Sequence, residues 1–313
     1  MKQLVILLFS VWITSIAWAQ APVLDSSLVD TPMRQLDKRK LYWVSGACVG
    51  TYSASMTGLY SLWYKNYSGG RFHTFNDNTE WLQMDKAGHA FSSFTLSRIG
   101  YESLAWTGLS KTKAALCGTG SAMAVMLSIE LFDGYSNQWG FSYGDIAANT
   151  VGASSFLVQE LLWKETRIKY CYSFHSTAYA SIRPDLLGTT FTEQMLKDYN
   201  GQTIWLSGNI RSFAPALNKL PKWINLAIGY GADGMVGGED NLFTDNNNEL
   251  VDYSNTYPRK REFYLSLDAD LTKIKMKPGL LKTLFGAIGI IKIPAPTLEM
   301  SQQGRFKFHP LYF

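Results

Sequence analysis

The segment D-K-A-G-H at residues 85–89 opens the part of the chain that decides its fold, which continues through E-L-F-D at 130–133 to S-Y-G-D-I-A-A-N at 142–149. Each segment places polar side chains among small and apolar residues. If the segments are helical, residues three or four positions apart lie on one helix face. Buried carboxylates are costly unless they are paired, hydrogen-bonded or bound to a cation. We therefore expect a shared polar site formed by Asp85, His89, Glu130, Asp133, Asp145 and Asn149.

Four hydrophobic stretches rich in small residues are expected to form a helical bundle that carries this site. They run from Leu41 to Tyr64, from an Asp77-x-x-Glu80 capping box to about Ala105, from about Lys111 to Asp133, and from Ser142 to about Trp163. In an up-down bundle, the start of the second, the end of the third and the start of the fourth helix lie at one end. His89 is therefore expected within roughly 3–5 Å of Glu130 or Asp145.

The first stretch, Leu41 to Tyr64, has two open interpretations. Its 24 residues carry no charge and are long enough to span a bilayer at about 1.5 Å per residue. Aromatic residues at both ends resemble the belts of membrane helices, whereas the many Ser and Thr residues also fit a buried helix of a soluble bundle. The aromatic ends favour insertion in a membrane or tight association with one.

The expected site allows several chemistries, and its cofactor is left unknown by the sequence. A histidine with several carboxylates can bind a divalent cation, and an oxygen-rich set suits Mg²⁺, Ca²⁺ or Mn²⁺ better than zinc. Alternatively, His89 oriented by Asp85 or Glu130 could act as a general base. Asp145 could instead cap its helix, His89 could be a hydrogen-bonded core residue, and the whole set could be a structural network.

The N-terminus has the pattern of an export signal. Lys2, a short apolar run and the A-W-A cleavage site at 17–19 predict that residues 1–19 are removed and that Gln20 begins the mature chain. Residues 20–40 are polar and irregular, and they are predicted to be a tether. The 313 residues then divide into a helical region at 41–166 and a second region at 167–313.

The composition excludes some functional classes. Without Lys2, the 29 basic residues become 28 against 25 acidic ones, a near balance that argues against a nucleic-acid partner. Cys48, Cys117 and Cys171 are too few for a disulfide framework, and their odd number leaves at least one free thiol or an intermolecular bond. The sequence shows no convincing zinc spacing, phosphate loop or nucleophile elbow.

The region 167–313 is predicted to be β-rich. Residues 223–230 and 261–271 alternate with the period of a strand, and in the second the apolar side chains at odd positions oppose polar ones at even positions. A short helix is expected at 191–199 and a long acidic loop at 231–260.

The last part of the chain is strongly apolar in places. Residues 280–291 are predicted to form a core or interfacial helix. The C-terminal F-K-F-H-P-L-Y-F resembles the last strand of outer-membrane proteins, although Pro310 interrupts its hydrogen-bond ladder. Two clear strands and a third are too few for a complete barrel. The expected fold is therefore α+β, with an antiparallel β-rich region packed on the four helices.

The pattern D-K-x-x-H, E-x-x-D and S-x-x-D-x-x-x-N resembles the DUF2279 family of predicted periplasmic lipoproteins, over roughly Trp81 to Leu162. More distantly it is similar to the VanZ-like membrane proteins. The segments K-D-Y-N-G-Q at 197–202 and H-P-L-Y-F at 309–313 resemble long versions from Bacteroidetes-type bacteria. The short relatives carry a lipobox cysteine, but no cysteine precedes Cys48 here, so a lipid anchor is not implied. The resemblance implies a compartment and a site, and it supplies no reaction.

Together these features predict an exported protein of the cell envelope, periplasmic or associated with the outer membrane, with a membrane or envelope component as its partner. The polar site is expected to bind or process a small ligand derived from the envelope. The alternative function is a non-catalytic scaffold of the outer envelope in which the same residues are structural.

Overall fold

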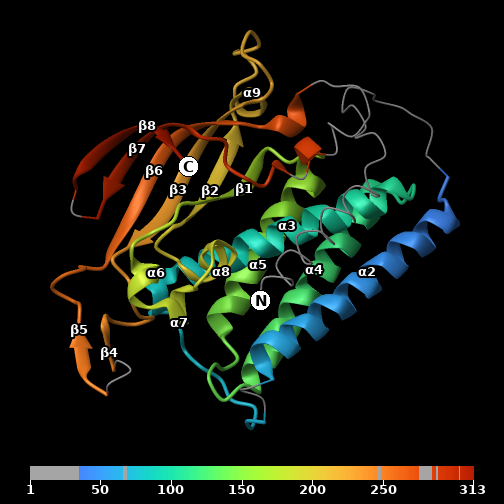
Figure 1. The fold of residues 1–313 in the computed structure, drawn as a ribbon. Helices are drawn as coiled ribbons and strands as arrows, with labels where there is room; N and C mark the ends of the chain where they lie inside the picture. The colour runs from blue at the N-terminus through green and yellow to red at the C-terminus, as the bar shows by residue number, and fades with distance from the viewer. Residues whose placement is uncertain (1–34, 66–68, 245–247, 275–283, 287, 303) are drawn as a thin grey trace.

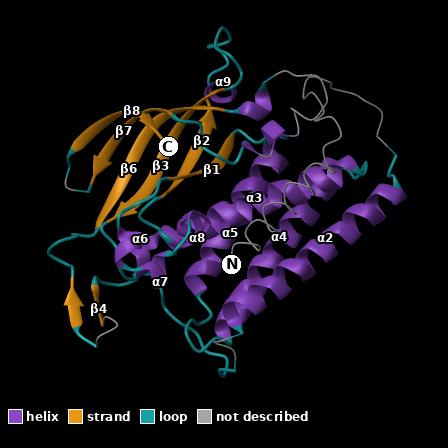
Figure 2. Ribbon diagram, viewed as in Figure 1, coloured by secondary structure: helices purple, strands orange, loops and turns teal. Residues whose placement is uncertain are grey.

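In the computed structural model, long helices form most of the first half of the chain, and an antiparallel sheet forms most of the second (Figure 1 and Figure 2). The structure describes residues 35–65, 69–244, 248–274, 284–286, 288–302 and 304–313. This arrangement confirms the predicted α+β class. The predicted signal peptide and residues 20–34 of the predicted tether lie outside the described residues.

The long helices form where the hydrophobic stretches predicted them. They are α2 (Lys38–Leu59), α3 (Met84–Trp106), α4 (Lys111–Gly134) and α5 (Tyr143–Leu162). A π-helical turn, Tyr60–Tyr64, continues α2. Because α2 begins at Lys38, the last three residues of the predicted tether are helical.

Small residues bring α3, α4 and α5 into close contact. A Cβ atom on Gly118 of α4 would lie 2.4 Å from the backbone nitrogen of Tyr101 in α3. A Cβ atom on Gly152 of α5 would lie 2.0 Å from the carbonyl oxygen of Ala90. Only glycine permits such backbone approach. By contrast, α2 packs loosely against the other helices, since Val44 alone is buried among the described residues of this helix.

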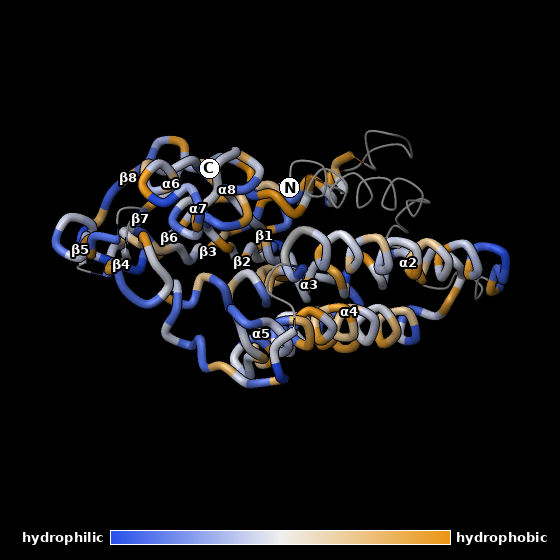
Figure 3. Tube along the Cα trace, turned by 60° about the horizontal axis from the view of Figure 1, so that its bottom comes forward, coloured by the Kyte–Doolittle hydropathy of each residue, from blue (hydrophilic) through white to orange (hydrophobic). Residues whose placement is uncertain are grey.

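One described helix, α4, is long and apolar enough to cross a membrane. Its mean hydropathy over the best window is 1.6, and its tube is largely orange in Figure 3. Core helices of soluble proteins meet the same criterion, and a third of that window is buried. The helix α2, which covers most of the predicted Leu41–Tyr64 span, does not meet the criterion.

The second half of the chain forms a sheet of six antiparallel strands in the order β1-β2-β3-β6-β7-β8. The strands are β1 (Ile168–Phe174), β2 (Gln202–Asn209), β3 (Ile224–Asp233), β6 (Lys260–Ala269), β7 (Ala295–Ser301) and β8 (Phe306–Tyr312). Thus β3 and β6 cover the two segments whose alternation predicted strands. Helix α3 contacts β1, β2 and β3, and it thereby joins the helices to the sheet.

Shorter elements connect these parts. They are the helices α6 (Tyr179–Ile182), α7 (Pro184–Leu187), α8 (Phe191–Lys197) and α9 (Ile210–Phe213), and the hairpin of β4 (Leu242–Thr244) with β5 (Leu250–Asp252). The predicted helix at 191–199 corresponds to α8, and the hairpin lies within the predicted loop at 231–260. Most of the predicted apolar helix at 280–291 lies outside the described residues, which include Leu284–Gly286 in helical conformation.

The predicted capping box at Asp77 and Glu80 is wrong. A 3₁₀ turn, Glu80–Gln83, precedes α3, and the three residues from Trp81 to Gln83 have φ values of 49°, 49° and 65°. This left-handed conformation is unfavourable for residues other than glycine. It is held by tertiary contacts, since the backbone nitrogen of Trp81 donates to the carbonyl oxygen of Gly238 at 2.7 Å. The turn aims the start of α3 toward α5.

Candidate functional site

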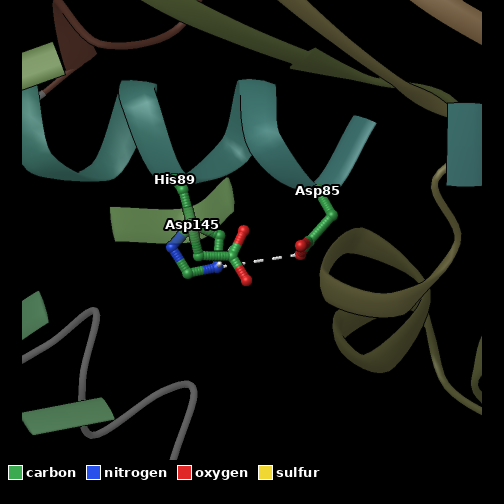
Figure 4. A group of neighbouring side chains, drawn as sticks. All are labelled: Asp85, His89 and Asp145. Carbon is green, nitrogen blue, oxygen red and sulfur yellow. Dashed lines mark ion pairs between the residues drawn. The ribbon is translucent and has the colours of Figure 1, made fainter. Parts of the chain in front are cut away.

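The imidazole of His89 lies between carboxylates from two helices (Figure 4). Its Nε2 atom is 3.8 Å from Oδ1 of Asp85, one turn earlier in α3, and 3.7 Å from Oδ1 of Asp145 in α5. These distances exceed hydrogen-bond length. Among the described residues, Nε2 makes no hydrogen bond, so this nitrogen and the two carboxylates surround a common point without bonding to one another.

The other imidazole nitrogen faces two further predicted residues. Nδ1 of His89 is 3.1 Å from Oδ1 of Asn149 and 3.6 Å from Oε1 of Glu130. Glu130 is 1% exposed, and its Oε1 atom has no hydrogen-bond partner in the described part of the chain. The structure therefore brings His89, Asp85, Glu130, Asp145 and Asn149 together from α3, α4 and α5. The expected distance of His89 from Glu130 and Asp145 is observed.

Asp133 does not join this group through a direct contact. Its Oδ1 atom accepts a hydrogen bond of 2.7 Å from the hydroxyl of Tyr64, in the π-helical turn after α2. The Tyr64 ring stacks on Phe132 at 5.4 Å between ring centroids. Asp133 therefore fastens the end of the first helical segment to α4.

A lysine that sequence reasoning did not select completes the site. Nζ of Lys86 lies 2.7 Å from Asp77, 3.1 Å from Asp85 and 2.7 Å from Asp145. The only signal for it in the sequence is its position inside the D-K-x-x-H pattern. Asp77 was assigned to a helix cap, but its other carboxylate oxygen accepts a 2.6 Å hydrogen bond from Ser142.

The segment 197–202 also contributes to the site. The hydroxyl of Tyr199 donates a 2.8 Å hydrogen bond to Oδ1 of Asp85. Its neighbours are fixed by their own bonds, because Asp198 accepts a 2.5 Å hydrogen bond from Thr177 and Asn200 donates to the carbonyl oxygen of Met235 at 2.8 Å. A tyrosine from outside the helices thus orients the first carboxylate of α3.

The residues around His89 lie in a segment that matches a family model. Residues 73–160 match the family model described as "Predicted periplasmic lipoprotein (DUF2279)". We call this matched segment the DUF2279 region. No curated protein and no solved structure matches the chain. The similarities to VanZ-like proteins and to long Bacteroidetes-type versions stay predictions.

The family description has one consequence for the compartment. A periplasmic family supports the predicted export of the chain. Every predicted site residue lies within the DUF2279 region, together with Asp77, Lys86 and Ser142, whereas Tyr199 lies beyond it.

Burial and mutual repulsion change the acidity of the carboxyl groups in the DUF2279 region. Burial raises the pKa of Glu130 to about 8 and that of Asp145 to about 7, and the Asp85 carboxylate adds to the second effect. Burial also raises the pKa of Asp133 to about 6. Asp85 is the exception, because His89 and Lys86 outweigh the effect of its burial and lower its pKa.

The carboxylates around His89 favour its protonated form. Burial opposes the positive charge of the imidazole, but Asp85, Asp145 and Glu130 outweigh burial and raise its pKa above the usual value. A raised pKa makes a histidine a weaker candidate for a general base at neutral pH. The surrounding carboxylates therefore argue against base catalysis by His89.

Asp145 does not act as a helix cap. Ser142 is the N-cap of α5, and its hydroxyl accepts a 3.1 Å hydrogen bond from the backbone nitrogen of Asp145. A capping box would require the Asp145 carboxylate to accept from the backbone nitrogen of Ser142. That nitrogen donates instead to Oε2 of Glu130 at 3.4 Å. The Asp145 carboxylate is free to face Lys86 and His89.

Three side chains could hold a divalent cation. One ligand atom each from Asp85, His89 and Asp145 lie within 4.8 Å of one another. Two carboxylate oxygens and one imidazole nitrogen are ligands that suit Mn²⁺ and related ions. Binding would require His89 to release its proton, so affinity for such an ion should rise with pH.

Replacing Glu130 by glutamine is expected to flatten the dependence of stability on pH. Between its unfolded pKa of about 4.3 and its folded pKa of about 8, Glu130 binds more protons in the folded state. The free energy of unfolding therefore decreases as pH rises through this window. Glu130→Gln should reduce that slope by at most about 1.4 kcal/mol per pH unit, as measured by urea unfolding from pH 5 to pH 8.

The control for this experiment is Glu193→Gln in the capping box of α8. Hydrogen bonds from Thr189 lower the pKa of Glu193, so its titration lies below the window and the slope should not change. A wild-type slope in Glu130→Gln would contradict the assignment of the raised pKa to Glu130.

Proposed function

We propose that this protein is an exported, membrane-associated envelope protein whose site around His89 binds a small, positively charged ligand. The observation that carries the proposal is the position of Nε2 of His89, which lies 3.8 Å from Asp85 and 3.7 Å from Asp145 with no hydrogen bond of its own among the described residues. A small ligand that enters between these groups would meet two carboxylates and one imidazole nitrogen.

The sign of the ligand charge follows from the charges of the site. Four carboxyl groups, those of Asp77, Asp85, Glu130 and Asp145, lie in contact with two basic groups, Lys86 and His89. Lys86 balances only part of this charge. An excess of buried acidic groups takes up protons, as the raised pKa values of Glu130 and Asp145 indicate, and a cation that binds can displace these protons. An amine or a divalent cation is therefore favoured over an anionic ligand.

Two side chains of the site are partly exposed. The side chain of Asp85 is 25% exposed and that of His89 is 17% exposed, whereas Glu130 behind them is buried. In this proposal a ligand approaches the Nε2 side of the imidazole, since Nδ1 contacts Asn149. In this proposal Glu130 and Asn149 position His89, and Asp85 and Asp145 contact the ligand.

The alternative function is a scaffold in which the same residues only hold the helices together. The observation that favours it is Lys86, whose ammonium group pairs with carboxylates from α3, from α5 and from the loop before α3. Such a network fixes the register of helices without any ligand. If the site binds a ligand, substitution of His89 should weaken binding and leave the protein folded. If the site is structural, the same substitution should lower stability.

Binding of Mn²⁺ and of ethanolamine, measured by calorimetry and by thermal shift, tests the proposal. The wild-type protein should bind at least one probe, and His89→Gln should weaken that binding roughly tenfold or more while the protein stays folded. His309→Gln is the matched control, because His309 pairs with Glu299 in the sheet, away from this site. If neither probe binds and His89→Gln loses stability, the scaffold function is correct.

A further inference from the structure

The six-stranded sheet has the reverse of the polarity expected for a sheet in water. The predicted alternation in β6 is present, but its polar set is buried and its apolar set is exposed. Ser266 and Asp268 are 3% and 4% exposed, whereas Leu265 and Leu267 are 45% and 51% exposed. Antiparallel sheets of soluble proteins place the apolar side chains inward and the polar ones outward.

The buried face carries polar groups on several strands beside the rings of Trp205 and Tyr264, and these polar groups are paired. Ser207 of β2 donates a 2.6 Å hydrogen bond to Asp268 of β6, and Asn225 of β3 donates to Ser207 at 2.9 Å. Nζ of Lys169 in β1 lies 3.4 Å from Asp270. These bonds remove the cost of burying the polar groups. The reversal of polarity is therefore a stable feature of the fold.

The exposed face is a continuous apolar surface set by strand register. A single row crosses five strands through directly paired residues, namely Leu206, Ile228, Leu265, Leu298 and Phe308. Their exposed fractions range from 36% to 64%. A neighbouring row pairs Phe263 with Met300 and Met300 with Phe306. Exposed apolar surfaces of this extent mark interaction sites.

The helices cover only one corner of this face. Ile204 and Tyr230 lie on the same face as Leu206 and Ile228, and they pack with Met84 of α3. In Figure 1, β7 and β8 lie on the side of the sheet away from α2, α3, α4 and α5. The rows through Leu265 and Phe263 therefore stay uncovered by the described helices.

The segment between β2 and β3, residues 210–223, is basic and exposes aromatic side chains. It contains Arg211, Lys219 and Lys222 and no acidic residue. Phe213 and Trp223 in this segment are 50% and 39% exposed. In Figure 1 the segment projects beyond the end of the sheet, after α9. Basic and aromatic side chains together are typical of segments that contact anionic lipid headgroups.

We propose that this apolar sheet face is a membrane-contact surface, which lies against lipid acyl chains while residues 210–223 contact anionic headgroups. Strands with apolar side chains outward and polar side chains inward are the arrangement that lipid favours. The charge of the 210–223 segment complements an anionic lipid and gives no advantage to a second copy of the same basic segment. The proposal is independent of the site around His89, and it assigns membrane contact to the sheet instead of to residues 41–64.

Flotation with lipid vesicles tests this surface. The whole chain, diluted from detergent, is mixed with vesicles of phosphatidylcholine alone or with added phosphatidylglycerol. The double variant Ile228→Ser/Leu265→Ser should lower the partition coefficient at least about tenfold. The double variant Leu242→Ser/Leu250→Ser is the matched control, because these exposed leucines lie on β4 and β5, outside the sheet, and it should float like wild type.

A second double variant tests the proposal even if Ile228→Ser/Leu265→Ser fails to fold. Lys219 and Lys222 are exposed, so Lys219→Gln/Lys222→Gln should leave the fold intact. It should reduce binding to the anionic vesicles about tenfold and leave binding to phosphatidylcholine unchanged. A wild-type chain that does not float, or an Ile228→Ser/Leu265→Ser variant that is folded and floats like wild type, would overturn the proposal. The proposal would also be overturned if the wild-type protein were a soluble dimer and Ile228→Ser/Leu265→Ser converted it to a monomer.

Discussion

Replacing Gly152 by alanine should remove about 3 kcal/mol or more from the free energy of unfolding, or prevent folding. Gly152 lies where α5 crosses α3, and the added Cβ would meet the carbonyl oxygen of Ala90 at 2.0 Å and the hydroxyl of Ser93 at 2.2 Å. A backbone oxygen cannot move without displacing α3. Because α3 carries Asp85 and His89 and α5 carries Asp145, the same shift would also separate the site.

The matched control is Gly120→Ala in α4. Gly120 is an exposed helical glycine, and an added Cβ would have no atom within 4 Å. Alanine there should stabilise the protein by about 0.5–1 kcal/mol through helix propensity. Urea unfolding gives the free energy of unfolding of both variants, so the same Gly→Ala change is compared at a helix crossing and on an exposed helix surface. Equal effects would show that helix crossing does not depend on the glycine of α5.

The sequence predicted the convergence of the site because helical spacing and bundle topology are properties that a sequence carries. Residues spaced by three or four positions on α3, α4 and α5 had to share faces. Short connections then placed the relevant helix ends together. The observed contacts of His89 with Glu130 and Asp145 follow from these two facts alone. The role of these residues in binding stays a prediction.

Contacts that depend on irregular backbone could not be predicted in this way. Asp77 and Glu80 fit a capping box, yet the left-handed turn at Trp81–Gln83 separates them from α3 and directs Asp77 toward Lys86. That turn is stabilised by contacts with residues more than 140 positions away, including a hydrogen bond from the Tyr230 hydroxyl to the carbonyl oxygen of Leu82. The local sequence around residues 81–83 does not indicate these distant partners.

The sheet shows a different limit. Alternation in residues 261–271 correctly predicted a strand and the division of its side chains between two faces. It did not state which face would be buried, because a period of two is the same in either orientation. The observed orientation is stabilised by the polar partners of Asp268 on β2 and of Ser266 on β7.

Replacing Lys86 by methionine should cost about 3–5 kcal/mol of stability, which is the penalty for leaving buried carboxylates without their cation. The ammonium group contacts Asp77, Asp85 and Asp145, and its side chain is 13% exposed. Methionine keeps the length and the apolar contacts of the chain, so the loss reports charge. Lys40→Met is the matched control, because Lys40 also pairs with an aspartate, at 3.7 Å, but on an exposed surface. It should cost about 0–1 kcal/mol.

A double-mutant cycle with Asp145→Asn separates the charge pair from packing. If Lys86 acts by neutralising Asp145, the loss caused by Lys86→Met should shrink by at least about 1 kcal/mol when Asp145 is already asparagine. Mn²⁺ offers a further readout, since a divalent cation bound near Asp85 and Asp145 would replace part of the missing charge and restore stability to Lys86→Met. Additive losses in the cycle would mean that Lys86 is held by packing, and the charge argument for a cationic ligand at His89 would then lose its basis.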